Sequence, residues 1–304
     1  MATLKGQNFR IIATEGSSLT VIAMATNCTV TLNNNTESAN TKDDVGNSSM
    51  PSVVSKSWSV SVESLKVLNL GQVLDDIKFM RKLFVMWDEV STTNNQTMME
   101  ASFARSGYAF LNDATFTFND RENSAKSLQF SGASPLEKIT KGTVETSVFT
   151  PNPTYTKGQF VRLFIGDNNT AVPSKVIAAA KSLSFHVSMS LEDATTKDTT
   201  GEWQVQEPTS VSYDITTNAL VRGGDTIEAT VGAQDLSSIM NIYESGMPVK
   251  WVIANVSGPN NRTIGTKIVS GSAVLTQLTI NSANQKNTDY TANLAGYGQY
   301  FIGN

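Results

Sequence analysis

The chain has 304 residues, enough for two domains of ordinary size, and only 16% of its residues are charged. Its formal net charge of -4, from 23 basic and 27 acidic residues, excludes a strongly basic nucleic-acid-binding protein. No apolar run approaches membrane-spanning length, and the first ten residues contain no apolar h-region, so we expect neither membrane insertion nor a secretory signal.

The first elements in chain order are strands. Residues 9–12 predict a first strand or an arm lying on a neighbour, and period-two patterning predicts strand structure within 21–32. The single cysteine, Cys28, alternates onto the apolar side, where we expect a small core residue, and it excludes a disulfide within the chain. Residues 33–56 are rich in Asn, Ser, Thr, Asp and Gly and predict a long polar hairpin. Residues 58–62 alternate apolar residues with serine and predict a half-buried strand.

A helix follows this strand. Its expected apolar face has residues spaced by four, three and four, namely Val73, Ile77, Met80 and Phe84. Further strands are predicted at 84–87, 108–111 and 116–118. The first half is therefore expected to combine several strands with one helix.

The second half runs through the same kinds of element. Residues 183–189 alternate as a strand with His186 on the polar face, and residues 211–215 form the return strand after a polar excursion. A short helix is predicted from the residues Leu236, Ile239, Met240 and Tyr243, with Asp235 near its start and Gly246 after its end. Residues 249–251 parallel residues 85–87, and residues 270–275 parallel residues 106–111.

One stretch of sequence occurs in both halves. Residues 36–43 read TESANTKD, and residues 191–198, at an offset of 155 (191 − 36 = 155), read LEDATTKD. Further matches at this offset are residues 21–25 with 176–180, Gly46 with Gly201, Trp58 with Tyr213, and Leu65 with Leu220. We interpret these matches as an internal duplication.

The two halves are separated by a segment with three prolines, Pro135, Pro151 and Pro153, which favour an extended chain outside a sheet interior. We therefore expect a first domain over residues 1–132, a linker over 133–157 and a second domain over 158–304. The expected fold class is mainly β (α+β), with one flanking helix and one long polar hairpin in each domain.

Catalytic chemistry is not indicated. His186 is the only histidine and has no nucleophile motif nearby, so an exposed strand histidine is the favoured interpretation. No Cys/His spacing predicts a metal site, and no Gly-rich phosphate loop predicts a cofactor. We therefore expect a protein that is not an enzyme and has no catalytic, metal or cofactor site.

The repeated motif carries a resemblance to a known family. In the first half the motif consists of Glu37, Ala39, Thr41, Lys42, Asp43 and Gly46, followed by the strand with Trp58. In the second half it consists of Thr196, Lys197, Asp198, Gly201, Glu202 and Trp203, followed by Tyr213. This pattern resembles the major tail tube proteins of tailed phages, although Ser48 in the first half replaces the residue that matches Trp203.

The resemblance implies two tandem tail-tube-like domains of β-sandwich or half-barrel form. It further implies that three chains form a ring with pseudo-six-fold symmetry, and that stacked rings form a hollow tube through which genomic DNA passes without specific binding. The implied partners are other copies of the chain, tail tip or initiator proteins and tail terminator proteins. The implied location is the virion tail, after synthesis in the host cytoplasm.

The resemblance also suggests roles for named residues. Expected ring-stacking or inter-subunit contacts come from the hairpins, through Glu37, Thr41, Lys42, Asp43, Gly46, Glu192, Thr196, Lys197, Asp198, Gly201 and Trp203. Expected core anchors are Trp58, Tyr213, Trp87 and Trp251. The alternative function is a tandem β-domain carbohydrate-binding or adhesin module on a virion or cell surface, and a contractile tail is as compatible with the sequence as a non-contractile one.

Overall fold

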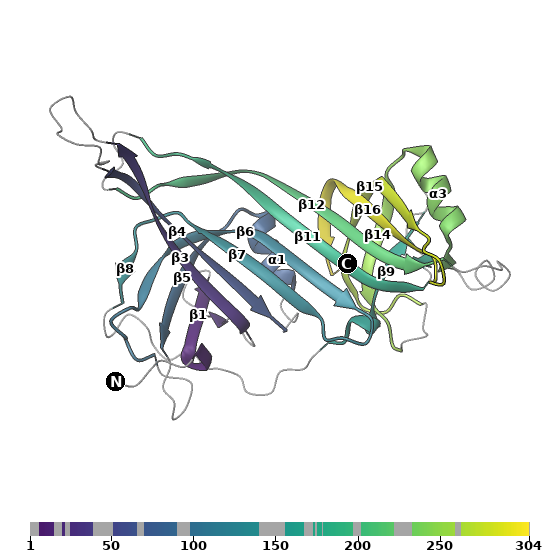
Figure 1. The fold of residues 1–304 in the computed structure, drawn as a ribbon, viewed down its shortest axis with the longest axis horizontal. Helices are drawn as coiled ribbons and strands as arrows, with labels where there is room; N and C mark the ends of the chain where they lie inside the picture. Colours follow the sequence, from purple (N-terminus) through teal and green to yellow (C-terminus); the bar gives the residue numbers. More distant parts are fainter. Residues whose placement is uncertain are drawn as a thin grey trace.

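The computed structural model describes residues 6–14, 20–21, 25–38, 51–65, 70–89, 98–139, 156–166, 173, 175–177, 179–196, 202–221, 233–258 and 263–303. These parts are mainly β, as predicted, and their strands join one 16-stranded sheet that is almost entirely antiparallel. Two helices, α1 (Leu70–Lys78) and α3 (Leu236–Ser245), and two short 3-10 turns, η1 (Gly6–Asn8) and η2 (Gly158–Phe160), accompany the sheet (Figure 1).

The strands fall into two groups along the chain. The first group contains β1 (Phe9–Thr14), β2 (Thr20–Val21), β3 (Ala25–Ser38), β4 (Pro51–Ser64), β5 (Lys82–Glu89), β6 (Arg105–Asn119), β7 (Ala125–Gly132) and β8 (Glu137–Lys138). The second group contains β9 (Val161–Ile165), β10 (Lys175–Ile177), β11 (Ala180–Asp193), β12 (Gln206–Leu220), β13 (Ala233–Gln234), β14 (Val249–Asn255), β15 (Lys267–Asn281) and β16 (Asp289–Ile302).

Both groups pair their main strands in the same order. Neighbouring strands of the first group run β2-β1-β5-β6-β7-β4-β3, and those of the second run β10-β9-β14-β15-β16-β12-β11. In addition, β8 pairs with β6 and β13 pairs with β10. The two groups are joined in one sheet because β11 of the second pairs with β6 of the first (Figure 1).

The registers of the two groups also correspond. Val30 pairs with Val60 in the β3–β4 hairpin, and Phe185 pairs with Ile215 in the β11–β12 hairpin, each residue shifted by 155 (30 + 155 = 185; 60 + 155 = 215). The β6–β7 ladder shifts register after Leu111, and the β15–β16 ladder does so after Leu275 (111 + 164 = 275).

The expected alignment of Trp87 with Trp251 is wrong, because the strand registers place Val85, two residues before Trp87, in the position of Trp251. Val85 lies opposite Gly107 in the first group, whereas Trp251 lies opposite Gly271 in the second. Residues two apart on a strand share a face, so either tryptophan still reaches the aromatic side chain of the neighbouring hairpin. The ring centroids are 5.8 Å apart for Trp58–Trp87 and 5.7 Å apart for Tyr213–Trp251.

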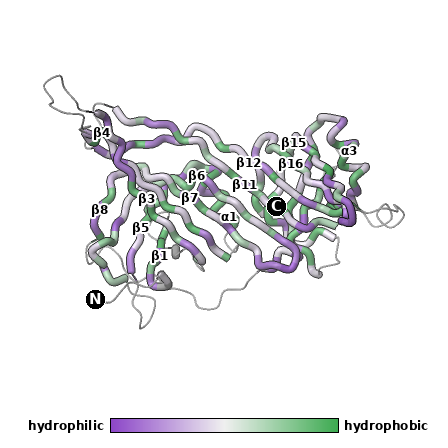
Figure 2. The backbone as a smooth tube through the Cα atoms, in the orientation of Figure 1, coloured by the Kyte–Doolittle hydropathy of each residue, from purple (hydrophilic) through white to green (hydrophobic). Residues whose placement is uncertain are grey.

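The main hydrophobic core contains buried residues from both strand groups. Trp58 on β4 packs on Trp87 on β5, although these two strands are not paired with each other. Trp58, Trp87, Tyr213 and Trp251 are all buried. Figure 2 shows hydrophobic and hydrophilic residues alternating along parts of the long strands, so these parts turn an apolar face toward the core and a polar face away from it.

Helix α1 is shorter than predicted. It ends at Lys78, after which Met80 adopts a positive φ of 51°, and Phe84 belongs to β5. The spacing that placed Phe84 on the helical face therefore crosses a turn. The buried residues of the helix are Leu70, Leu74, Asp76 and Ile77.

Helix α3 has the expected ends but a different buried face. The Asp235 carboxylate accepts a hydrogen bond from the Ser238 amide, and Gly246 ends the helix with a φ of 62°. Ile239 and Ile242 are buried, whereas the predicted face residues Met240 and Tyr243 are 41% and 49% exposed.

The first residues of the expected linker, 133–139, pack against the first strand group instead of separating two domains. The indole of Trp58 donates a 2.8 Å hydrogen bond to the carbonyl of Ser134, and β8 pairs with Arg105 and Ser106 of β6. Residues 140–155 lie outside the described parts of the chain.

Candidate assembly interface

The seam between the two strand groups is built on β6, because this strand is longer than its neighbour β5. On one edge, β5 covers β6 only as far as Phe110, and β11 pairs with the remaining residues, 113–119. The other edge of β6 carries β7. One strand therefore holds its own group together and also accepts the second group.

The apolar side of the seam is fully packed. The rings of Phe116 and Phe185, which lie opposite each other, are stacked with centroids 6.5 Å apart. Val187, opposite Ala114, is also fully buried. Fully burying side chains of this size contributes about 1.5–3 kcal/mol each, so apolar contacts are the main stabilising term of the seam.

Helix α1 of the first group adds to the seam from this apolar side. The hydroxyl of Tyr300, on β16 of the second group, donates a 2.7 Å hydrogen bond to the carbonyl of Leu74. The ammonium of Lys78 donates to the carbonyl of Tyr300 at 3.1 Å. Leu74 and Ile77 are completely buried in this arrangement.

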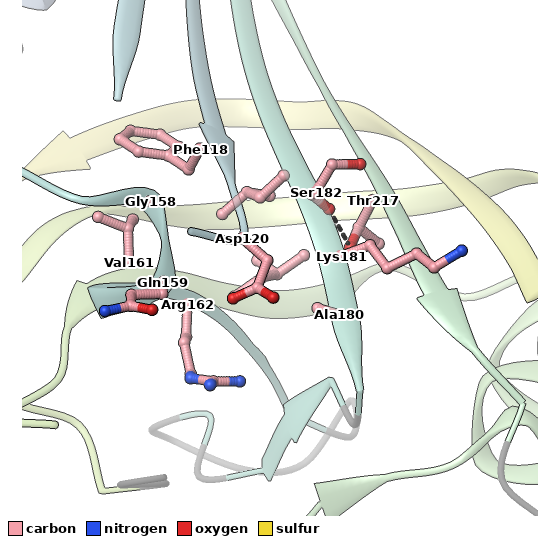
Figure 3. A pocket seen from close by; sticks show the side chains of 12 residues that line it. Phe118, Asp120, Gly158, Gln159, Val161, Arg162, Ala180, Lys181, Ser182 and Thr217 are labelled. Carbon is pink, nitrogen blue, oxygen red and sulfur yellow. Dashed lines mark hydrogen bonds between the residues drawn. The ribbon is translucent and has the colours of Figure 1, made fainter. Parts of the chain in front are cut away.

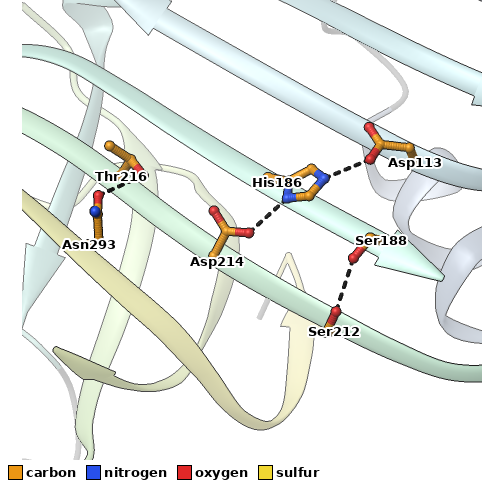
Figure 4. A network of polar contacts seen from close by, with 7 residues as sticks. All are labelled: Asp113, His186, Ser188, Ser212, Asp214, Thr216 and Asn293. Atoms are coloured by element: carbon orange, nitrogen blue, oxygen red, sulfur yellow. Dashed lines mark hydrogen bonds and ion pairs between the residues drawn. The ribbon is translucent and has the colours of Figure 1, made fainter. Parts of the chain in front are cut away.

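On the polar side, His186 bridges three neighbouring strands (Figure 4). Its Nε2 lies 2.7 Å from Oδ2 of Asp113 on β6, and its Nδ1 lies 2.7 Å from Oδ1 of Asp214 on β12. Further along this side, Ser188 and Ser212 share a hydrogen bond of 2.9 Å. The polar side thus carries hydroxyl groups and an ionic cluster around His186.

The geometry of this bridge favours the charged form of the imidazole. A neutral imidazole has one N–H, so it donates to only one carboxylate, whereas the imidazolium donates to both. Burial lowers the pKa of His186, but the hydrogen bonds and charges of Asp113 and Asp214 outweigh burial, so the pKa lies above its ordinary value.

A small pocket lies at one end of the seam, where β6, η2 and β11 meet (Figure 3). Its lining includes Asp120, Gln159 and Lys181, and Thr217 there donates a hydrogen bond to the carbonyl of Ser182. Its volume of about 30 Å³ leaves room for about two or three water molecules, since a cavity needs roughly 10–15 Å³ on this measure to hold one. The pocket is therefore too small for an organic ligand.

The two long hairpins touch near their ends. The amide of Lys56 on β4 donates to the carbonyl of Glu202, and the amide of Gln204 donates to the carbonyl of Lys56 at 3.0 Å. The Lys56 ammonium also lies 2.5 Å from the Glu202 carboxylate. Trp203, which lies between Glu202 and Gln204 in the chain, forms a β-bridge with Lys56 and is half-buried against the main core.

Only some of the hairpin residues expected to form contacts lie in the described parts. Glu37, Glu192 and Thr196 are exposed near the ends of the hairpins, and Trp203 is half-buried as described above. The remaining expected contact residues lie outside the described residues, namely Thr41, Lys42, Asp43, Gly46, Lys197, Asp198 and Gly201.

The residues that join the two groups were mostly missed by sequence reasoning. Alternation placed His186 on the polar face, but its partners are 73 and 28 residues away along the chain. Lys56 gave no signal that it would bind Glu202. Sequence spacing reports which side of a strand a residue occupies, and it does not report which strand lies alongside.

Two further properties concern the described residues alone. They contain no group of three His, Cys, Asp or Glu side chains arranged to hold a metal ion. None of their helices combines the length and apolar character needed to cross a membrane.

Comparisons with known proteins gave matches to solved structures only. No family model and no curated protein matches the chain. Two of the similar structures are described as the tail of an empty GTA particle with C6 symmetry and the virion of a native gene transfer agent particle. Both are 16% identical and cover 49% of this chain and 99% of their own, with TM-scores of 0.37 and 0.36. A third, the SPP1 tail tube, is 15% identical and covers 48% of this chain and 78% of its own, with a TM-score of 0.33.

Proposed function

We propose that the chain is a structural virion protein that polymerises as stacked rings into a hollow phage tail tube. The observation that carries this proposal is the seam in which β11 of one strand group pairs with the uncovered part of β6 in the other. The seam is a head-to-tail contact between two units with the same strand order. Repetition of such a contact generates a ring when the rotation closes.

The proposal includes a tandem duplication, with one tail-tube-like domain in each half of the chain. The repeated motif, the identical order of the main strands and the corresponding registers of both hairpins support it. Three chains then supply six similar units to one ring, which gives pseudo-six-fold symmetry.

The polar side of the sheet is proposed to line the lumen. Helix α1 packs on the apolar side of the seam, and the polar side of the same strands carries mainly hydroxyl and amide side chains such as Ser184, Thr216 and Asn293. The imidazolium of His186 on this face is held between two carboxylates. A wall without a basic excess would not hold DNA through its phosphates, which suits passage of the genome without specific binding.

In such a tube, the partners of each chain are other copies of the chain in the same ring and in the rings above and below. Proteins at the tail tip would initiate the tube, and terminator proteins would end it. The long hairpins that carry the motif are proposed to make the contacts between rings.

The proposed function is tested by electron microscopy of the purified full chain at increasing concentration, with mass measurement in solution. Rings containing three chains, or hollow tubes of stacked rings, are the expected result. A chain that stays monomeric at every concentration, even with tail-tip complex as a seed, would overturn the proposal.

A further inference from the structure

Several large apolar side chains are exposed although their counterparts in the other strand group are buried. Leu32 on β3 is 61% exposed, and its counterpart at the offset of 155, Val187, is completely buried. Ile280 on β15 is 46% exposed, and its counterpart at the offset of 164, Phe116, is also completely buried. Val187 and Phe116 are buried because they lie in the seam between β11 and β6.

Helix α3 shows the same difference from helix α1. Met80 and Gly246 each follow their helix with a positive φ. The amide of Met80 donates to the carbonyl of Ile77, and the amide of Gly246 donates to the carbonyl of Tyr243. These equivalent helix ends align the two helices at an offset of 166 (246 − 80 = 166). The counterparts of the exposed Met240 and Tyr243 are therefore Leu74 and Ile77. The latter two are completely buried where α1 meets the second strand group.

The strands that carry Leu32 and Ile280 each have all or part of one hydrogen-bonding edge without a neighbouring strand among the described residues. Among the described residues, β3 pairs with β4 on one edge and with no strand on the other. In the same parts of the chain, β14 covers β15 only as far as Ala273, so residues 275–281 have β16 on one edge and no strand on the other. The counterpart of β3 is β11, and the counterpart of the end of β15 is the end of β6. These two counterparts pair with each other in the seam within the chain.

We propose that β3 of one copy pairs with residues 277–281 of β15 and the adjoining Ser282 in a second copy, antiparallel and in the register of the β11–β6 seam, while α3 of the second copy packs its exposed face on the first. This inference rests on the proposed ring and names its contact. The β11–β6 register places Phe185 opposite Phe116 and Leu183 opposite Phe118. Transferred to the open edges, it places Val30 opposite Ile280 and Cys28 opposite Ser282.

The contact between copies differs chemically from the seam within the chain. The ionic cluster of the internal seam has neutral counterparts, since Thr31, Gln277 and Ser59 take the places of His186, Asp113 and Asp214. At the hairpin contact, Val211 takes the place of Lys56, so the ammonium of the Lys56–Glu202 pair also has a neutral counterpart. The contact between copies therefore lacks the titrating bridge that the internal seam contains.

Disulfide capture tests the register. Cys28 is the only cysteine, so Ser282→Cys supplies one new partner that the proposed register places directly opposite. Under mild oxidation of the assembled protein, we expect covalent dimers and larger multimers that disappear on reduction. The matched control is Asn281→Cys, because successive side chains on a strand point to opposite faces of the sheet. The unaltered protein serves as the control for any Cys28–Cys28 bond. Efficient linkage of Asn281→Cys with none of Ser282→Cys would overturn the register.

Charge substitutions test the surface independently. Ile280→Asp and Met240→Asp place a carboxylate in the proposed contact, so each is expected to lower the fraction of assembled protein by at least tenfold while leaving a folded monomer by circular dichroism. Met99→Asp is the matched control, because Met99 is 55% exposed and belongs to the connection between β5 and β6, outside the strands and the helix of the proposed contact. Normal assembly of both variants into rings overturns this contact while the tube proposal stands. Absence of any assembly in the unaltered protein overturns both.

Discussion

The imidazole of His186 and the carboxylate of Asp113 lie 2.7 Å apart across the seam that joins the two strand groups. Asp214 approaches the other ring nitrogen at the same distance. Because the imidazolium alone donates to both carboxylates, the stability of the seam depends on the protonation of one side chain.

Stability is expected to depend on pH through His186. The pKa of this residue is raised in the folded protein, so its contribution is fully present below the ordinary value of about 6.5 and is lost as the pH rises through the folded pKa. For partly exposed ion pairs the loss is about 1 kcal/mol or less. Urea unfolding between pH 5.5 and 9 measures it, and His186→Gln should remove this part of the pH dependence. An unchanged profile in His186→Gln would contradict the assignment.

Two glycines are expected to be required beside the aromatic anchors. A Cβ atom on Gly132 would overlap the indole of Trp58, and one on Gly296 would overlap the ring of Tyr213. Overpacking of a well-packed core costs about 1–3 kcal/mol, so Gly132→Ala and Gly296→Ala should each lower the free energy of unfolding by that amount. Gly258→Ala is the control, since among the described residues no atom beyond its chain neighbours lies within 4 Å of the place that its methyl group would occupy. Equal urea midpoints for the three variants would disprove the steric argument.

Asp88 is expected to be a strong structural requirement. It is completely buried, and its carboxylate accepts hydrogen bonds from the amides of Glu89, Glu100 and Ala101. Asp88→Ala leaves these donors without their partner, at a cost of about 1–3 kcal/mol for each buried group left unsatisfied. Thermal unfolding should show a large drop in Tm for Asp88→Ala. Asp120→Ala, which removes a half-exposed carboxylate, should change Tm little.

The ion pair between the hairpins should contribute little on its own. The side chains of Lys56 and Glu202 are 36% and 56% exposed, and exposed pairs contribute about 0.2–1 kcal/mol. The backbone hydrogen bonds of Lys56 persist when its side chain is shortened. A double-mutant cycle with Lys56→Ala and Glu202→Ala should therefore give a small coupling energy that decreases with added salt. A coupling well above this range would show that the pair itself holds the hairpins together.

Local patterns in the sequence determined most of the individual elements. Alternation of apolar residues with serine predicted the strand around Trp58, and Asp235 and Gly246 marked the ends of α3. The offset of 155 also brought the two hairpins into correspondence before any strand pairing was known. These features follow from the periods of strands and helices and from capping chemistry, which depend on neighbours along the chain.

Only the tertiary structure decided which elements meet. It placed β11 on the part of β6 that β5 leaves uncovered, and it brought His186 between two carboxylates from other strands. It also buried Leu74 while leaving Met240, its counterpart in the proposed duplication, exposed. A repeated sequence gives each copy the same apolar face, but burial of that face depends on what lies next to it, which spacing along one chain does not contain.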